Sequence, residues 1–161
     1  LLDRLHARGV SHMLVLVGED SPQWLETYGK WAKESPAVDR VIDLGDRVDD
    51  SWLAGLYARA SVFLLPSLYE GFGLPALEAM AAGTPVMVSN RGALPEIVGQ
   101  AAGDPIDPLD LDAWEHRLVR LLESPSEREQ LSALGRKRAA EFSWEKQTEF
   151  LVEAFHAAIH A

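Results

Sequence analysis

Apolar residues in this chain follow two alternating patterns, and the alternation predicts an α/β fold. Short continuous apolar runs, such as residues 12–18, are typical of parallel strands covered on both faces. Between them, apolar residues recur at every third or fourth position, which indicates amphipathic helices. Because strands and helices alternate, we expect a Rossmann-like, doubly wound parallel sheet with helices on both faces. The predicted strands are 12–18, 41–44, 62–65 and 86–88; the predicted helices are 1–9, 21–34, one beginning at 49–51, 74–82, 94–98, 109–123, 124–142 and 143–160.

Several local features refine this prediction. Residues 104–108 contain two prolines and are expected to be extended at a sheet edge. The basic cluster at residues 136–138 is expected to be a solvated helix face. Apolar side chains at helical spacing in two of the predicted helices are expected to be core contacts. For the helix at residues 21–34, this interpretation is favoured over a set of ligand-binding residues. The apolar side chains are Trp24, Leu25, Tyr28 and Trp31 in that helix, and Leu111, Trp114, Leu118 and Leu121 in the other.

The segment from Leu74 to Ala82 is predicted to be a short helix with a single polar side chain, Glu78. A helix that is apolar on every side is normally buried. A buried carboxylate is costly unless it accepts hydrogen bonds. We therefore expect a ligand beside Glu78. The alternative is that Glu78 only complements the positive end of the helix dipole, as acidic residues in a first turn often do.

A glycine-containing loop joins the preceding strand to this helix. Gly71 and Gly73 can take positive φ or let a ligand approach the backbone, although a lone Gly-x-Gly occurs in many turns. Pro75 fits the first helical turn, where no N–H is needed. The free N–H groups at the helix start suit phosphate or sugar hydroxyls. Because helical side chains lean toward the helix start, Glu78 is expected near the pocket that Glu70 reaches from the loop. A nucleotide sugar carries both kinds of group and would satisfy this site.

Composition excludes several classes of function. A chain of 161 residues corresponds to one domain, and its net charge of −10 argues against a general nucleic-acid surface. The chain has no cysteine, which excludes disulfides, thiolate metal sites and cysteine nucleophiles and fits the cytoplasmic location that we predict. No apolar run approaches the roughly 20 residues of a membrane span. We expect no metal and no cofactor, because no histidine lies near the motif or has metal-ligand spacing; the histidines are at positions 6, 12, 116, 156 and 160.

The spacing of Glu70 and Glu78, with Gly-Phe-Gly-Leu-Pro-Ala-Leu between them, resembles the E-x7-E motif of the family-four (group 1) glycosyltransferases. The resemblance covers nearly the whole chain in the right order. It includes residues 39–45, 56–60, 66–75, 78–86, 89–96 and 142–145. It implies a retaining enzyme of the GT-B fold, with this chain as the C-terminal, donor-binding half.

The resemblance also implies roles for individual residues of the loop and helix. Glu70 would contact the donor sugar near its reacting carbon, as a positioning and charge-stabilising group rather than a covalent nucleophile. The backbone N–H groups of Gly71, Phe72 and Gly73 would hold sugar hydroxyls. The N–H of Leu74 would contact the diphosphate at the helix start. The Glu78 carboxylate would accept hydrogen bonds from the ribose hydroxyls.

The nucleotide base would be held by the segment after the second strand. In the family, backbone groups there cradle the base, and the corresponding residues here are 45–48, which include Arg47 and Val48. This segment is one residue longer than the usual pattern. Arg47 has two open interpretations: it reaches a phosphate or it lies in solvent.

The start of the chain implies a domain boundary. Leu1 to Gly9 has the pattern of a helix end closed by glycine. In the family a strand, a loop with an Arg and a Lys for the diphosphate, and a whole acceptor domain come before this helix. We therefore expect residues 1–161 to be a single nucleotide-sugar-binding domain, truncated at its front edge, with the acceptor domain absent. Its expected partners are a nucleotide-sugar donor and that acceptor domain, through which peripheral membrane contact could occur, and not nucleic acid.

The predicted function is transfer of a sugar, with mannose favoured, from a nucleotide diphosphate sugar to an acceptor hydroxyl in polysaccharide biosynthesis. The isolated fragment is expected to be inactive, because transfer requires both substrates to be held together. The alternative is a non-catalytic nucleotide-sugar-binding or scaffold domain, against which the presence of both Glu70 and Glu78 argues. A nucleotide-sugar epimerase of similar two-domain fold has no support from the E-x7-E motif.

Overall fold

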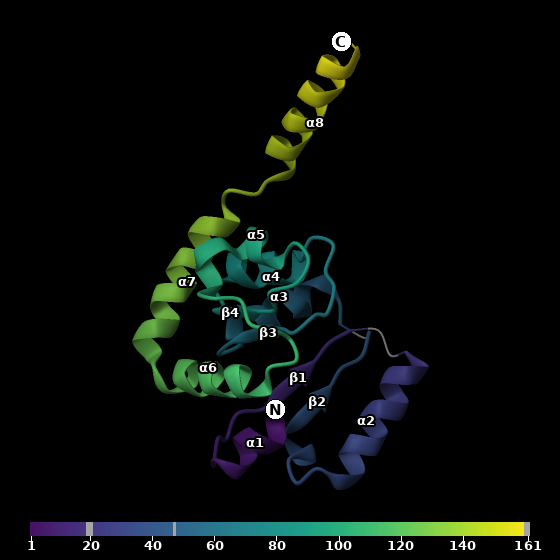
Figure 1. Cartoon of the computed structure of the whole chain (residues 1–161), viewed down its shortest axis with the longest axis vertical. Helices are drawn as coiled ribbons and strands as arrows, with labels where there is room; N and C mark the ends of the chain where they lie inside the picture. The colour runs from purple at the N-terminus through teal and green to yellow at the C-terminus, as the bar shows by residue number, and fades with distance from the viewer. Residues whose placement is uncertain (19–20, 47, 160–161) are drawn as a thin grey trace.

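The computed structural model describes residues 1–18, 21–46 and 48–159, and it confirms an α/β chain with parallel strands (Figure 1). The elements are α1 (Leu2–Ala7), β1 (Leu14–Leu16), α2 (Pro22–Glu34), η1 (Val38–Arg40), β2 (Val41–Asp43), α3 (Asp50–Arg59), β3 (Phe63–Leu65), α4 (Leu74–Ala82), β4 (Val86–Val88), α5 (Leu94–Val98), η2 (Gly99–Ala102), α6 (Leu111–Glu123), α7 (Pro125–Ala139) and α8 (Trp144–Ile159).

The strands form two parallel pairs rather than the single sheet that the sequence predicts. Leu14 pairs with Val41 in the first sheet, and Phe63 pairs with Val86 in the second. Residues around Ile106 add a further extended segment along β4, as expected for the proline-flanked stretch. Its amide donates to the carbonyl oxygen of Val88 at 3.0 Å. Apolar runs identify strands but not their partners, so the sequence pattern could not separate the two pairs.

Helices cover both faces of the β3–β4 sheet, as the doubly wound prediction requires. On one face, Val86 and Val88 pack with side chains of α3, α4, α5, η2 and α7. On the other face, Met87 packs with Trp114 and Leu121 of α6 and with side chains of α1 and α7. All three β4 side chains are at most 1% exposed. This buried strand is the rigid support for the loops that follow β3 and β4.

The β1–β2 sheet is less covered than its apolar pattern predicts. Met13, Val15 and Val17 are 49%, 39% and 44% exposed, and Ile42 on the neighbouring strand is 44% exposed. The prediction that the run 12–18 is covered on both faces is therefore wrong. A continuous apolar run indicates a strand that can be buried, but the neighbouring elements decide whether it is.

The aromatic residues of α2 form a half-buried surface stack rather than a core. The rings of Trp24 and Tyr28 lie 5.5 Å apart, and those of Tyr28 and Trp31 lie 5.7 Å apart. The indole Nε1 of Trp31 donates to Asp3 at 2.9 Å. Leu25 is 52% exposed, so the prediction of a core contact is wrong for it and only partly right for the three aromatic residues.

The C-terminal helices differ in how they pack. Within α6, Trp114, Leu118 and Leu121 are buried as predicted, but Leu111 is 45% exposed because it lies at the first position of the helix. The basic cluster on α7 is not simply a solvated face. Arg138 donates to the carbonyl oxygens of Glu96 and Ile97, at 2.7 and 2.9 Å.

Helix α8 extends away from the other elements, and all of its residues are exposed (Figure 1). No helix in the described part of the chain is both long enough and apolar enough to cross a membrane.

Candidate functional site

The loop between β3 and α4 delivers a set of free amide groups to the start of a well-defined helix. Gly73 is the N-cap residue, with φ +99°, and Pro75 lies in the first turn, so the predicted bounds of α4 are confirmed. The carbonyl of Gly73 accepts from the amides of Ala76 and Leu77. The amides of residues 71–74 have no hydrogen-bond acceptor in the described part of the chain, and no side chain caps the helix. Four donors are therefore available at the positive end of α4.

Glu70 lies beside this helix start, as predicted. A Cβ built on Gly73 would be 3.7 Å from Glu70 Cγ, so the Glu70 side chain lies next to the N-cap residue. Glu70 is half-buried, and its carbonyl oxygen accepts from the amide of Ala93 at 3.2 Å. A carboxylate and a group of N–H donors thus occupy one place, which suits a ligand with both hydroxyl and phosphate groups.

Residues of the loop after β4 contact the loop after β3 and support it. The hydroxyl of Ser89, a fully buried residue, donates to the carbonyl oxygen of Ser67 at 2.6 Å. Leu94 is fully buried, and its Cδ2 would lie 2.7 Å from a Cβ on Gly73. Only glycine fits at position 73, because φ is positive and Leu94 occupies the space. Sequence reasoning missed this support, although residues 89–96 carried part of the family resemblance.

Phe72 is also held by a distant segment of the chain. Its ring packs edge-to-face on that of Phe142, with ring centroids 6.1 Å apart. The guanidinium of Arg138 lies over the Phe142 ring, 4.7 Å from the ring centroid. Phe72 itself remains 41% exposed. The segment 142–145 had been singled out in the sequence only by resemblance, and the structure supplies its physical connection to the glycine loop.

Glu78 lies on α4 as expected, but the reason given for a ligand beside it is wrong. Only one face of α4 is fully buried, the face that carries Ala76, Ala79 and Met80. Glu78 lies outside this face and is exposed. Its Oε2 accepts from the hydroxyl of Tyr57 on α3 at 3.2 Å. The carboxylate therefore has water and a protein partner, and burial alone does not demand a ligand.

Tyr57 is the more strongly perturbed member of this pair. It is 8% exposed, and its ring packs edge-to-face on Phe63 of β3. Burial raises the pKa of the Tyr57 hydroxyl well above its usual range, and the neighbouring Glu78 carboxylate raises it further. The hydroxyl therefore stays protonated and donates to Glu78, which fixes the position of that carboxylate. Sequence reasoning identified Tyr57 only as part of an apolar stripe.

The segment predicted to cradle a nucleotide base is described in part. Gly45 is buried with φ +55°, accepts from the amide of Gly18 at 3.0 Å and donates to Asp43 Oδ1 at 3.1 Å. Val48 is half-buried just before α3. Arg47 lies outside the described residues, so both interpretations of it remain predictions. The carboxyl ends of β1 and β2 are joined by the Gly18–Gly45 bond.

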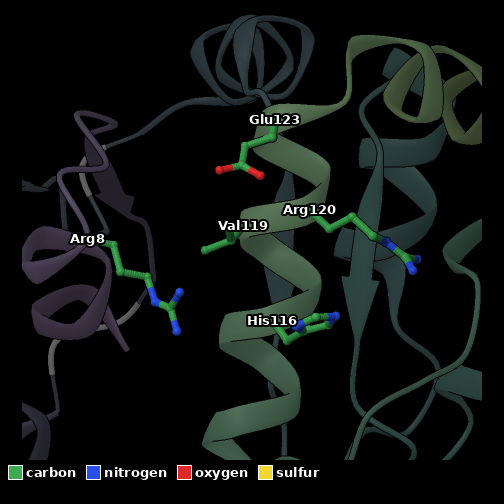
Figure 2. Close-up of a pocket in the computed structure, with 5 residues that line it drawn as sticks. All are labelled: Arg8, His116, Val119, Arg120 and Glu123. Carbon is green, nitrogen blue, oxygen red and sulfur yellow. The ribbon is translucent and has the colours of Figure 1, made fainter.

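A surface pocket of about 360 Å³ lies elsewhere, between α1 and α6 (Figure 2). In Figure 2, Arg8 comes from the end of α1, whereas His116, Val119, Arg120 and Glu123 come from α6. Arg8 already pairs with Glu115, and Arg120 pairs with Glu127 at 3.0 Å. Because both cations have carboxylate partners, this pocket does not compete with the β3–α4 loop as a candidate anion site. Among the described residues, no group of three or more His, Asp or Glu side chains could hold a metal ion.

Comparison with known proteins supports one family. Residues 1–138 match the family model described as glycosyl transferases group 1. The chain is 39% identical over 166 aligned residues to an MMP α-(1→4)-mannosyltransferase of Mycolicibacterium hassiacum, covering 94% of this chain and 40% of that protein. It is 41% identical over 143 residues to the O-antigen chain mannosyltransferase B of Escherichia coli, covering 83% of this chain and 37% of that protein. The chain therefore spans about two fifths of the length of these relatives.

Solved structures agree with this assignment. Sucrose-phosphate synthase from Thermosynechococcus elongatus superposes with a TM-score of 0.82 and 34% identity, over 98% of this chain and 42% of the synthase. The C-terminal domain of a group 1 glycosyl transferase from Francisella tularensis superposes with a TM-score of 0.73 and 23% identity, over 87% of this chain and 75% of that domain, and this match concerns the fold alone. With its α/β fold, its E-x7-E loop and these relatives, the chain belongs to the group 1 glycosyl transferases and has the fold of a GT-B C-terminal domain.

Proposed function

We propose that this chain is the nucleotide-sugar-binding domain of a retaining glycosyltransferase that transfers a hexose to an acceptor hydroxyl. The observation that carries the proposal is the set of free amides at residues 71–74 next to the Glu70 side chain. Amide donors at a helix start favour the diphosphate, and a nearby carboxylate accepts hydrogen bonds from sugar hydroxyls. A nucleotide sugar carries both groups a few bonds apart.

Glu78 takes part in this proposal in a different way from the buried carboxylate expected from the sequence. The Tyr57 hydroxyl holds Oε2, and Oε1 has no hydrogen-bond partner within the described residues. An oriented, exposed carboxylate with one free oxygen can accept a hydrogen bond from a ribose hydroxyl. Val48 and the preceding residues after β2 would contact the base, and the role of Arg47 stays a prediction.

The proposed chemistry assigns no covalent step to the protein. The bond between the anomeric carbon and the leaving diphosphate breaks, and a bond from the acceptor oxygen forms on the same face of the sugar. The acceptor proton passes to an oxygen of the leaving diphosphate. Glu70 orients the sugar and stabilises the positive charge that develops at the anomeric carbon. The amides of residues 71–73 hold sugar hydroxyls, and the amide of Leu74 stabilises the negative charge on the leaving group, so the proposal needs no metal or cofactor.

Mannose is the favoured sugar, because two relatives with 39% and 41% identity are named as mannosyltransferases. We also predict that the protein takes part in polysaccharide biosynthesis and that it is located in the cytoplasm. The relatives are more than twice as long as this chain. We infer that residues 1–161 form a single domain that acts with a separate acceptor-binding domain and transfers no sugar alone, since catalysis needs both substrates in one place.

A binding experiment separates this proposal from a scaffold domain that has kept only the fold. The 161-residue chain is titrated with GDP, UDP and ADP while the amide signals of residues 71–74 are followed by NMR. We expect shifts at those amides with at least one nucleotide. If no nucleotide moves these signals, the scaffold alternative is favoured.

The Glu78→Ala variant then tests the ribose contact. A hydrogen bond to a charged group contributes roughly 1.5–3 kcal/mol, so the Kd for the nucleoside diphosphate should rise about 10- to 100-fold. Glu153→Ala on α8 is the matched control, because it removes the same charge from an exposed helical position. Equal affinities of the Glu78→Ala and control variants would contradict the ribose role.

A further inference from the structure

We propose that the turn from Ser89 to Gly92 is the positioning element for Glu70, and that it requires glycine at position 92. The inference rests on the proposed donor-binding function and extends it to residues that do not touch the donor. Two observations carry it: the contact of Gly92 with the Glu70 backbone, and the attachment of the turn to the most buried strand of the fold.

Gly92 lies directly against the backbone of Glu70. A Cβ at position 92 would be 2.2 Å from the Glu70 carbonyl oxygen and 2.9 Å from its amide nitrogen. Real Cβ atoms essentially never approach other atoms within 3.0 Å, and the neighbour here is backbone rather than the end of a flexible side chain. Gly92 also has φ +57°, which side-chain-bearing residues rarely adopt. The absence of a side chain at this position is therefore what allows Glu70 to lie where it does.

Two further contacts fix the same region, one from the first residue of the turn and one from the residue that follows it. The amide of Ala93 donates to the Glu70 carbonyl oxygen at 3.2 Å, and the Ser89 hydroxyl donates to the Ser67 carbonyl oxygen at 2.6 Å. Ser89 directly follows β4 and is 0% exposed. Glu70 thus belongs to an irregular loop, but its backbone is held by a turn anchored on a buried strand. The turn that follows β4 therefore sets the position of the Glu70 carboxylate.

This support matters because the role proposed for Glu70 depends on position. A side chain at residue 92 would force the turn and the Glu70 backbone apart, because a Cβ 2.2 Å from the Glu70 carbonyl oxygen is closer than real Cβ atoms approach. A misplacement of about 1 Å in a catalytic site can lower the rate about a hundredfold. The proposed diphosphate and ribose contacts come from the Leu74 amide and from Glu78, whereas the atoms nearest to a Cβ on Gly92 all belong to the Glu70 backbone. The expected signature is therefore loss of recognition of the sugar with retention of the nucleotide.

The experiment compares two Kd values in the 161-residue chain by calorimetry: one for a nucleoside diphosphate and one for the corresponding nucleotide sugar. The pairs used are GDP with GDP-mannose, UDP with UDP-glucose and ADP with ADP-glucose. For the pair that binds the unmodified chain, we expect Gly92→Ala and Glu70→Ala each to raise the Kd of the nucleotide sugar about tenfold. The Kd of the nucleoside diphosphate should change less than about twofold.

Gly9→Ala is the matched control. Gly9 has φ +77°, and a Cβ there would meet nothing within 4 Å. This variant therefore introduces backbone strain of the same kind without pressing on Glu70, and both Kd values should stay as in the unmodified chain. A direct structural readout accompanies the binding data: the amide signals of residues 70–73 should move in Gly92→Ala and not in Gly9→Ala.

The outcomes separate the two levels of the proposal. Two results would overturn the positioning role and leave the proposed function standing. In the first, Glu70→Ala weakens nucleotide-sugar binding but Gly92→Ala does not. In the second, Gly92→Ala weakens the binding of both ligands equally. If Glu70→Ala binds nucleotide sugar as tightly as the unmodified chain, the sugar-contacting role of Glu70 fails and the positioning role fails with it. If Gly92→Ala does not fold, as judged by near-ultraviolet circular dichroism, Ser89→Ala decides. That variant should raise the nucleotide-sugar Kd about fivefold with the nucleoside diphosphate Kd unchanged, and an unchanged nucleotide-sugar Kd would overturn the inference.

Discussion

Replacement of Tyr57 by Phe tests how the Tyr57–Glu78 hydrogen bond contributes to stability. The substitution keeps the aromatic ring that packs on Phe63 and removes only the hydroxyl. Because Glu78 is exposed, water can replace the lost donor, so we expect the loss of stability near neutral pH to be only about 1 kcal/mol. A pair buried on both sides would lose more, since the remaining carboxylate would have no solvent to accept from.

The pH dependence gives a sharper result, because the pKa of Tyr57 is raised in the folded protein. Above the unfolded pKa of about 10, the unfolded chain releases a proton from Tyr57 that the folded chain retains. Stability contributed by the protonated hydroxyl is therefore complete below that pH and falls as the pH rises. At pH 11 the loss amounts to about 1.4 kcal/mol for a group that stays protonated in the folded state. This loss is absent from Tyr57→Phe.

The measurement is urea denaturation of the unmodified chain and of Tyr57→Phe at pH 7, 9, 10 and 11. The advantage of the unmodified chain should be constant up to pH 9 and should disappear by pH 11. Subtracting the two free energies of unfolding removes the contributions of the titrating groups that the two proteins share. A difference that stays constant to pH 11 would refute the reasoning, because Tyr57 would then titrate alike in both states.

Further predictions concern packing and capping. At Gly135 of α7 a Cβ would lie 3.3 Å from the fully buried Met80 side chain, which has no room to move, so the packing cost should exceed the helix-propensity gain and Gly135→Ala should destabilise the chain by up to about 2 kcal/mol. In contrast, Gly29→Ala within α2, where a Cβ meets nothing within 4 Å, should stabilise it by about 0.5–1 kcal/mol; thermal denaturation of both variants checks the opposite signs. Ser124→Ala removes the side-chain cap that accepts from the amide of Glu127 at 3.3 Å, and should cost about 1 kcal/mol in urea denaturation. An unchanged midpoint would show that the cap is replaced by water.

The sequence predicted local structure well where the signal is local. The start of α4 follows from Gly73, which has the positive φ that glycine allows, and from Pro75 in the first turn as predicted; at its end Gly83, with φ +87°, caps the helix. The starts of α2 and α3 follow from Ser21 and Asp49, whose side chains accept from the first turn. These features depend on neighbours within four residues, so one sequence contains them in full.

The sequence predicted tertiary surroundings less well. The sequence predicts a buried Glu78 because its helix is apolar all round, yet Ala76, Ala79 and Met80 are buried on one face of α4 and Glu78 is exposed. Residues 12–18 were expected to be covered because they are apolar, yet several are exposed. Composition gives the tendency of a segment to be buried, but the partner that buries it comes from distant parts of the chain. The same reason explains why the supports of the site, Gly92 beneath Glu70 and Phe142 beside Phe72, could not be derived from spacing.

The contact of Phe72 with Phe142 also has a consequence for the order of folding. Two residues separated by the whole of α4, β4, α5, η2, α6 and α7 must meet before the glycine loop has its final support. Contacts of such long sequence separation form late, because the entropy of closing the intervening chain must be overcome first. The β3–β4 pair and its helices can therefore assemble while the ligand loop is still mobile. We therefore expect the glycine loop to become competent for binding only after α7 has packed against the β3–β4 core.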